Sequence, residues 1–150
     1  MKTNISLFVM MTMTQIKVTT EINSSVEKVW EIISDLDNEP KFWKGTKEIH
    51  NISKEGNKVT REVIIAFRDS KCLQEVLLVP KERIEANFTE GIIKGKKIIS
   101  LRPLNGGVLL EAVWDMKLSG MMGMFTGMIK KHVQNGTELA LQAIKKEAEK

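Results

Sequence analysis

From Thr46 to Leu118, hydrophobic residues recur mostly at every second position, in short runs that turn sequences interrupt. This alternation is typical of strands with one buried face and one face in water. It is clearest in residues 108–118, where the even positions are hydrophobic and the odd positions include Glu111 and Asp115. The pattern predicts six consecutive strands, at about residues 47–53, 58–67, 72–79, 83–89, 96–104 and 108–118.

The residues on either side of this region complete the predicted set of elements. Thr14–Ile22 also alternates and predicts a further strand, whereas the period becomes helical after Ser24 or Ser25, either of which can cap a helix. A second short helical turn is predicted around Pro40. After Gly120 the helical period continues to the end of the chain. The predicted apolar face of this terminal helix comprises Phe125, Met128, Ile129, His132, Val133, Gly136, Ala140, Ala143 and Ile144.

The order of the elements predicts an α+β fold. We expect a curved antiparallel sheet of seven strands wrapped around the long C-terminal helix, with two short helices after the first strand. A strongly curved sheet cannot close fully against one helix, so we expect space between them. Space of this kind is where small molecules bind.

The length and composition of the chain indicate one domain, residues 1–150. A single cysteine, Cys72, excludes an internal disulfide, and no zinc-ligand spacing is present. We therefore expect a cytoplasmic protein with no metal and no cofactor. The apolar stretch within residues 1–12 is too short to span a bilayer. We interpret residues 1–12 as an over-extended or disordered start, with a strand extension or a membrane-touching arm as alternatives.

The basic residues of the chain permit contact with an anionic surface without requiring it, since the net charge is only +4. The sequence KGKK, Lys94–Lys97, together with Arg102 is the main basic cluster. It lacks the interleaved aromatic residues that single-strand binders use, so nucleic acid is not an expected partner. We interpret the cluster as a solvated strand edge that discourages aggregation.

The start of the terminal helix, SGMMGMFTGMIKKHV (residues 119–133), is rich in methionine and glycine. Glycine inside a helix costs about 1 kcal/mol relative to alanine, and methionine fills irregular space without fixing it. We interpret this segment as a soft gate at the mouth of the cavity, with ordinary core packing as the alternative. The gate hypothesis assigns ligand contacts to Met121, Met124, Phe125 and Met128, and movement of the helix end to Gly120, Gly123 and Gly127.

A few other side chains are candidates for the cavity. Arg61 lies on an otherwise apolar strand face, and if it points inward it needs a partner, either Glu75 on the next strand or an acidic group of a ligand. If the strand is turned the other way, Arg61 lies in water. His132 could donate to a ligand carbonyl or act as a general base, and is otherwise structural. Trp114 could stack on a flat ligand, and Trp43 could close the cavity entrance or dip into a membrane interface, with core packing as the default for both.

Several segments together resemble the START/birch-pollen-allergen superfamily, often labelled SRPBCC, and its helix-grip fold. They are Ser24–Trp43, the hairpin EGNKVTREV that contains Arg61, Leu77–Ile84, Gly106–Met116 and the terminal helix. Within the superfamily the chain is most similar to the polyketide cyclase/dehydrase and coenzyme-Q-binding-protein group. The resemblance covers Thr14–Glu149. It implies binding of sterols, lipids, quinones, plant hormones or polyketides in a cavity, and the His-His-Asp iron ligands of the dioxygenase branch are not matched.

These observations predict a carrier or binding protein for a hydrophobic small molecule such as a lipid, an isoprenoid quinone or a polyketide-like compound. The alternatives are a cyclase/dehydratase-type enzyme that uses the same cavity, and an accessory protein that docks on a membrane or an oxidoreductase complex. No catalytic residue is assigned, transient contact with a membrane surface is allowed, and the oligomeric state is left open. The candidate ligand-binding residues are Trp43, Arg61, Ile65, Glu75, Phe88, Trp114, Met116, Met121, Met124, Phe125, Met128 and His132.

Overall fold

The computed structural model describes residues 13–118 and 126–150, in which seven strands form one antiparallel sheet. The strand order across the sheet is β1-β7-β6-β5-β4-β3-β2. From β2 to β7, each strand pairs with the next strand along the chain. The order of these six strands in the sheet is therefore the same as their order in the sequence. The strands are β1 (Met13–Ile22), β2 (Thr46–Glu55), β3 (Lys58–Ile65), β4 (Ser70–Val79), β5 (Arg83–Glu90), β6 (Ile93–Leu104) and β7 (Gly107–Leu118).

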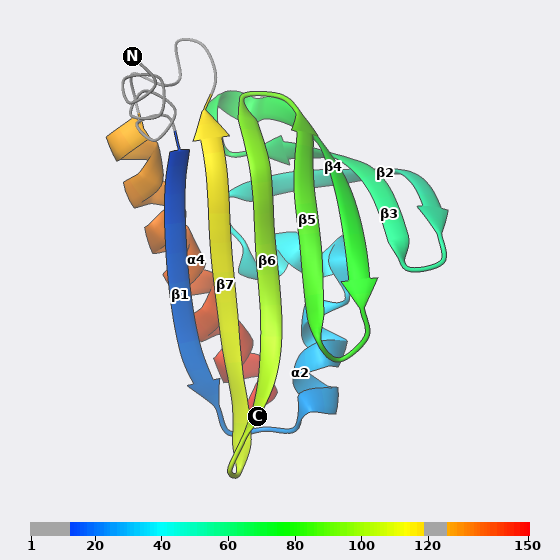
Figure 1. The fold of residues 1–150 in the computed structure, drawn as a ribbon, viewed down its shortest axis with the longest axis vertical. Coiled ribbons are helices and arrows are strands. Elements are labelled where there is room, and N and C mark those ends of the chain that lie inside the picture. The colour runs from blue at the N-terminus through cyan, green and yellow to red at the C-terminus, as the bar shows by residue number, and fades with distance from the viewer. Residues whose placement is uncertain (1–12, 119–125) are drawn as a thin grey trace, which may run out of the picture.

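Strand β1 joins the sheet at the edge formed by the last strand. It pairs with β7 from Met13↔Lys117 to Ile22↔Val108. The chain then crosses to the far edge, where β2 pairs with β3 through two register irregularities. The sheet curls strongly between the two edges (Figure 1).

The helices lie on the concave side of this sheet. They are α2 (Val26–Ile33), the 3-10 turn η1 (Leu36–Asn38), α3 (Glu39–Phe42) and α4 (Thr126–Ala148), and a further 3-10 turn η2 (Phe67–Asp69) precedes β4. Ser25 caps α2 by accepting a hydrogen bond from the Lys28 backbone N–H at 3.1 Å. Figure 1 shows α4 running behind β1 and β7, with α2 at the lower right, beside the C-terminal half of α4. The expected fold, a curved seven-stranded sheet around a long C-terminal helix, is confirmed.

The buried face of α4 differs from the predicted stripe. Ile129, Thr137, Ala140, Leu141, Ile144 and Ala148 are its buried residues. Thr137 and Leu141 were absent from the prediction, whereas Met128 is 46% exposed. Leu139 is also hydrophobic but 65% exposed, so hydrophobicity alone does not define which residues of α4 are buried.

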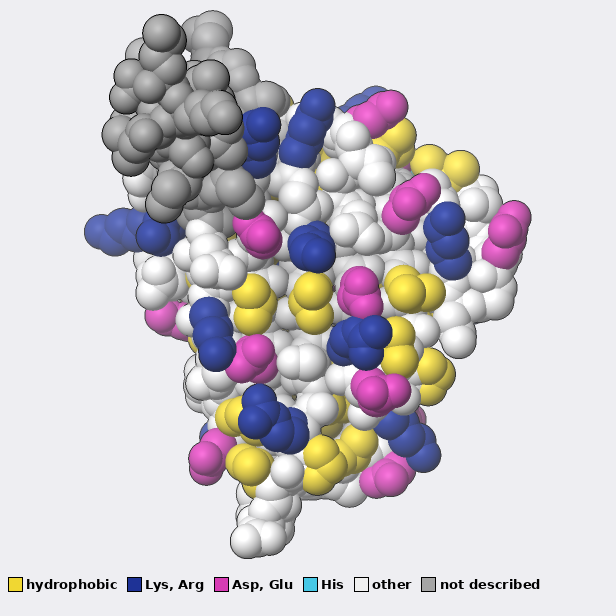
Figure 2. Space-filling view, viewed as in Figure 1, with side chains coloured by type: hydrophobic (Ala, Val, Ile, Leu, Met, Phe, Trp, Pro, Cys, Tyr) yellow, Lys and Arg dark blue, Asp and Glu magenta, His cyan; other side chains and the backbone are white. Residues whose placement is uncertain are grey.

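The two faces of the sheet differ in character, as the alternation of residues predicts. The outer face carries basic and acidic side chains interspersed with hydrophobic ones (Figure 2), including the ion pair between Lys17 Nζ and Glu111 Oε2 at 3.5 Å. The inner face forms the hydrophobic core with α2 and α4. In the described ranges, no helix has the length and apolar character needed to cross a membrane.

Candidate ligand cavity

A cavity of about 500 Å³ lies between the inner face of the sheet and α4. This volume is within the usual range for small-molecule sites. The sheet contributes mainly apolar side chains to its wall, among them Val63, Ile65, Phe88 and Ile93. The described lining from α4 is Ile129, His132, Val133, Asn135, Gly136, Thr137 and Leu139.

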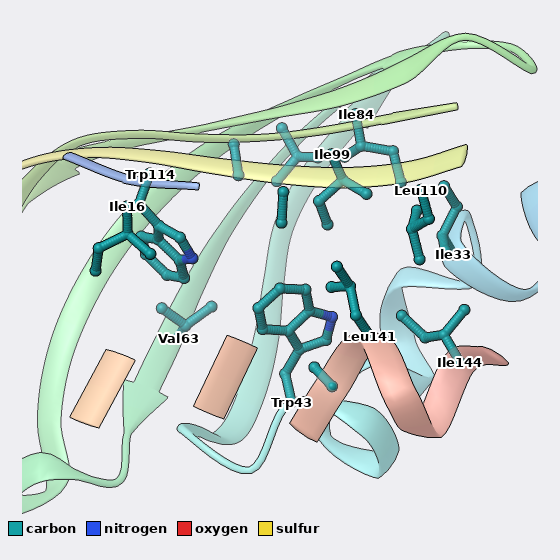
Figure 3. Close-up of a cluster of buried hydrophobic side chains, with 14 of the residues drawn as sticks. Ile16, Ile33, Trp43, Val63, Ile84, Ile99, Leu110, Trp114, Leu141 and Ile144 are labelled. Atoms are coloured by element: carbon teal, nitrogen blue, oxygen red, sulfur yellow. The ribbon is translucent and has the colours of Figure 1, made fainter. Parts of the chain in front are cut away.

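Three aromatic rings form one part of the cavity wall. The Phe88 and Trp114 rings are stacked with centroids 5.8 Å apart, and the Trp43 and Trp114 rings form a T-shaped pair with centroids 6.3 Å apart. Figure 3 shows Trp114 extending from the sheet and Trp43 approaching from the opposite side. Such an arrangement offers flat apolar surface to a ligand.

Trp114 is held in place by α4. Its indole Nε1–H donates to Thr137 Oγ1 at 3.0 Å, and that hydroxyl donates to the Val133 carbonyl at 2.7 Å. Both polar groups of this buried contact are therefore satisfied, and the ring position is coupled to the helix.

We expect Thr137→Val to destabilise the protein by about 1–3 kcal/mol, because the indole N–H loses its acceptor inside the core. Urea unfolding measures this loss. Thr19→Val, at an exposed position of β1, is the control and should change the unfolding free energy by no more than about 0.5 kcal/mol. Equal effects of the two substitutions would show that the Trp114 hydrogen bond does not contribute.

Three charged side chains meet behind the aromatic wall, in a second, smaller pocket. Arg61 Nη2 donates to Glu39 Oε1 at 2.7 Å, and Lys97 Nζ lies 3.8 Å from Glu39 Oε2. Arg61 also donates from Nε to Gln74 Oε1 at 2.9 Å and from Nη1 to the Leu36 carbonyl at 3.4 Å. Arg61 is fully buried and Lys97 is 3% exposed. We call Glu39, Arg61 and Lys97 the charged cluster.

Lys97 connects this charged cluster to the cavity. Its side chain borders both pockets, and its ammonium lies 3.9 Å from the centroid of the Trp43 ring and 5.1 Å from that of Trp114. A cation over the face of an indole is attracted by the ring quadrupole. The two tryptophans thus stabilise the ammonium and form the cavity wall at the same time.

Burial and charge oppose each other in the charged cluster. Burial by itself would raise the pKa of Glu39, but the nearby Lys97 and Arg61 outweigh it and hold this pKa below its ordinary value. For Lys97, burial lowers the pKa, and Arg61 adds to this effect while Glu39 partly offsets it. Glu39 is therefore the carboxylate that keeps two buried cations compatible with the fold.

The lowered pKa of Glu39 predicts a pH dependence of stability. A carboxyl group whose pKa is lower in the folded state stabilises the fold above its unfolded pKa, about 4.3, and this contribution is lost as pH falls through the folded pKa. The difference in unfolding free energy between the wild type and Glu39→Gln should therefore stay constant from pH 8 to about pH 5 and shrink below about pH 4. Urea unfolding across this range measures it, and a constant difference down to pH 3 would contradict the assignment.

The sequence comparison identifies the family. The family model described as "Polyketide cyclase / dehydrase and lipid transport" matches residues 13–149. The chain belongs to this family. A search among curated proteins found no match.

Solved structures show the fold of this family in other proteins. An aromatase/cyclase, ZhuI from Streptomyces sp. R1128, has a TM-score of 0.75 at 15% identity, with 91% of this chain and 94% of that chain covered. TTHA0849 from Thermus thermophilus has a TM-score of 0.78 at 15% identity, covering 90% and 97%. A START superfamily protein from Mycobacterium smegmatis has a TM-score of 0.64 at 17% identity, covering 87% and 98%. The resemblance to the START superfamily and its helix-grip fold is thus confirmed.

The structure of this family member places Arg61 inward but gives it a different partner from the one expected. Glu75 lies on the outer face, where its Oε1 is 3.9 Å from Lys58 Nζ. The pleat of β4 turns Gln74 inward and Glu75 outward, and Gln74 is the register partner of Arg61. The proposed Arg61–Glu75 pair is therefore wrong, and Arg61 borders the smaller pocket rather than the main cavity.

Among the other candidates, Trp43, Ile65, Phe88, Trp114 and His132 line the cavity. Met116 is buried in the core, and Met128 is exposed; neither belongs to the described lining. The other predicted ligand contacts lie outside the described residues; they are Met121, Met124 and Phe125. The same holds for two glycines of the gate hypothesis, Gly120 and Gly123.

Sequence reasoning missed Glu39, Gln74, Thr137 and above all Lys97. Lys97 is predicted from the sequence to lie in a solvated basic strand edge, but in the structure it faces inward with Ile93, Ile99 and Leu101. These four residues are all at odd-numbered positions of one strand, and this spacing of two could have identified Lys97 as inward-facing. The accessory-protein alternative predicts that the apolar N-terminus, Trp43 and Lys94–Lys97 share one exposed surface, but Trp43 and Lys97 are buried.

Proposed function

We propose that this protein binds a hydrophobic small molecule, of the lipid, isoprenoid quinone or polyketide-like class, in the cavity and acts as its carrier or binding protein. The observation that carries the proposal is the cavity of about 500 Å³ with a mainly apolar wall between the sheet and α4. The family description, which includes lipid transport, supports the same reading.

Burial of apolar surface supplies the binding energy. Each Å² of apolar ligand surface removed from water contributes about 25 cal/mol, from which the cost of association is subtracted. Trp43, Phe88 and Trp114 already line the cavity, and a hydrogen bond to α4 fixes the Trp114 ring. A preformed wall reduces the ordering cost of binding.

Mass spectrometry of the purified protein tests the proposal. The protein is measured under native conditions, then denatured and extracted with organic solvent. We expect a stoichiometric extra mass that disappears on denaturation and is recovered in the extract. A bare protein that also fails to take up a panel of quinones, fatty acids and aromatic polyketides would refute the carrier function.

A cyclase/dehydratase-type enzyme is the second candidate, and two observations favour it. The family description names cyclases and dehydrases, and the cavity wall contains Lys97 and His132 as groups able to exchange protons. Incubation with a compound that the protein binds distinguishes the two functions. A carrier returns the compound unchanged, a dehydratase returns it lighter by one water, and a cyclase that does not dehydrate returns an isomer of equal mass that chromatography separates from the starting compound. Lys97→Met or His132→Ala should abolish either conversion.

A further inference from the structure

The ionisable side chains of the described cavity wall are all basic. Lys44, Lys97 and His132 are among the lining residues, and no Asp or Glu is present in the part of the lining that the structure describes. The nearby carboxylate, Glu39, is engaged by Arg61 and belongs to the smaller pocket. The wall therefore offers hydrogen-bond donors and positive charge to a ligand.

Lys97 is the buried member of this basic set. Its 3.8 Å separation from Glu39 Oε2 is longer than a direct hydrogen bond. An ammonium has three N–H donors and no acceptor. The two indole rings attract the ammonium through cation–π contacts, which do not use up its N–H groups as hydrogen-bond donors. N–H donors of Lys97 therefore remain available to a ligand in the cavity.

Gln74 provides a second donor on the same wall. Arginine only donates hydrogen bonds, so the atom of Gln74 that meets Arg61 Nε at 2.9 Å must be the carbonyl oxygen. The amide NH₂ of Gln74 is then directed away from Arg61. Gln74 is buried, and it lines the cavity, where its NH₂ can donate to a ligand.

The charged cluster is short of negative charge. Arg61 and Lys97 are matched by one carboxylate, Glu39, so its formal charge is +1 when all three groups are ionised. Buried charges are stable when they are paired. An acidic group delivered by the ligand would complete this pairing at Lys97.

We propose, on the basis of the proposed binding function, that the ligand is an apolar molecule with one carboxylate or comparable acidic oxygen group, held by Lys97 and the Gln74 amide. The apolar body lies against Trp43, Phe88 and Trp114. The same headgroup chemistry occurs in fatty acids and in aromatic acids, which differ in the shape of the body.

Two matched ligand pairs test this inference by isothermal titration calorimetry. Dodecanoate is compared with dodecanol, and 2-naphthoate with 2-naphthamide, so the acidic group changes while the body is retained. We expect the acid of at least one pair to bind about tenfold or more tightly than its neutral partner, which corresponds to about 1.4 kcal/mol or more. The pair with the larger preference distinguishes a fatty acid from an aromatic acid.

Variants assign the preference to Lys97. Lys97→Met should reduce the preference for the acid over its neutral partner to less than about threefold, and methionine is a suitable buried replacement for the lysine side chain. Lys96→Met removes the same charge from the neighbouring exposed position and should retain the preference. Equal binding of acid and neutral compound by the wild type, or a preference that persists in Lys97→Met, overturns this inference and leaves apolar binding intact. Failure of all four compounds to bind would overturn this inference, whereas the proposed binding function falls only if the purified protein is also bare and takes up no compound of the wider panel.

Discussion

Glu39→Gln is expected to lower the free energy of unfolding by about 3–5 kcal/mol, the usual cost of removing one partner from a buried ion pair. The substitution keeps the shape of the side chain but removes its charge. Arg61 and Lys97 would then both remain buried without a carboxylate at 2.7 and 3.8 Å. Because domains are stable by only about 5–15 kcal/mol in total, this is a large fraction of the stability. Urea unfolding at pH 7 measures it.

The matched control uses the same substitution in an exposed ion pair. Glu75→Gln removes the partner of Lys58 on the outer face and should cost no more than about 1 kcal/mol. Adding Lys97→Met to Glu39→Gln should recover part of the stability, because one unpaired cation is replaced by an apolar side chain. If Glu39→Gln and Glu75→Gln cost the same, the charged cluster is not held by Glu39.

Gly136→Trp is expected to weaken ligand binding by about tenfold or more, because the new ring occupies the cavity. Gly136 lines the cavity from α4, and a Cβ atom at this position would meet no heavy atom within 4 Å. Tenfold corresponds to about 1.4 kcal/mol, less than the contribution of two buried methylene groups. Titration calorimetry with dodecanoate and with 2-naphthoate measures the change.

The fold should tolerate this substitution, since tryptophan has a higher helix propensity than glycine. Thermal unfolding checks that the variant is intact. Gln134→Trp adds the same ring at an exposed position of the same helix and should leave binding unchanged. A folded Gly136→Trp variant with wild-type affinity would place the ligand outside the cavity.

Local patterns in the sequence determined most of the fold. Each strand alternates with period two, and each connection contains turn residues, so strand positions and the hairpin order follow from neighbours in the chain. Ser25 caps α2 through an atom three residues away. The inward orientation of Arg61, and the positions of Trp43, Phe88 and Trp114 at the cavity, also follow from which face of an element is apolar.

The tertiary structure decided which polar groups meet. Glu39 and Arg61 are 22 residues apart, and the register of β3 with β4 and the position of α3 bring Glu39 rather than Glu75 to the guanidinium. The same packing buries Lys97 between two indole rings, although its immediate neighbours in sequence are exposed or partly exposed. The period-two pattern of a strand predicts on which face of the sheet a side chain lies. Its hydrogen-bond or ion-pair partner depends on which elements, distant in the sequence, pack against that face. The fold was therefore predictable from local periodicity, whereas the charge at the cavity wall was not.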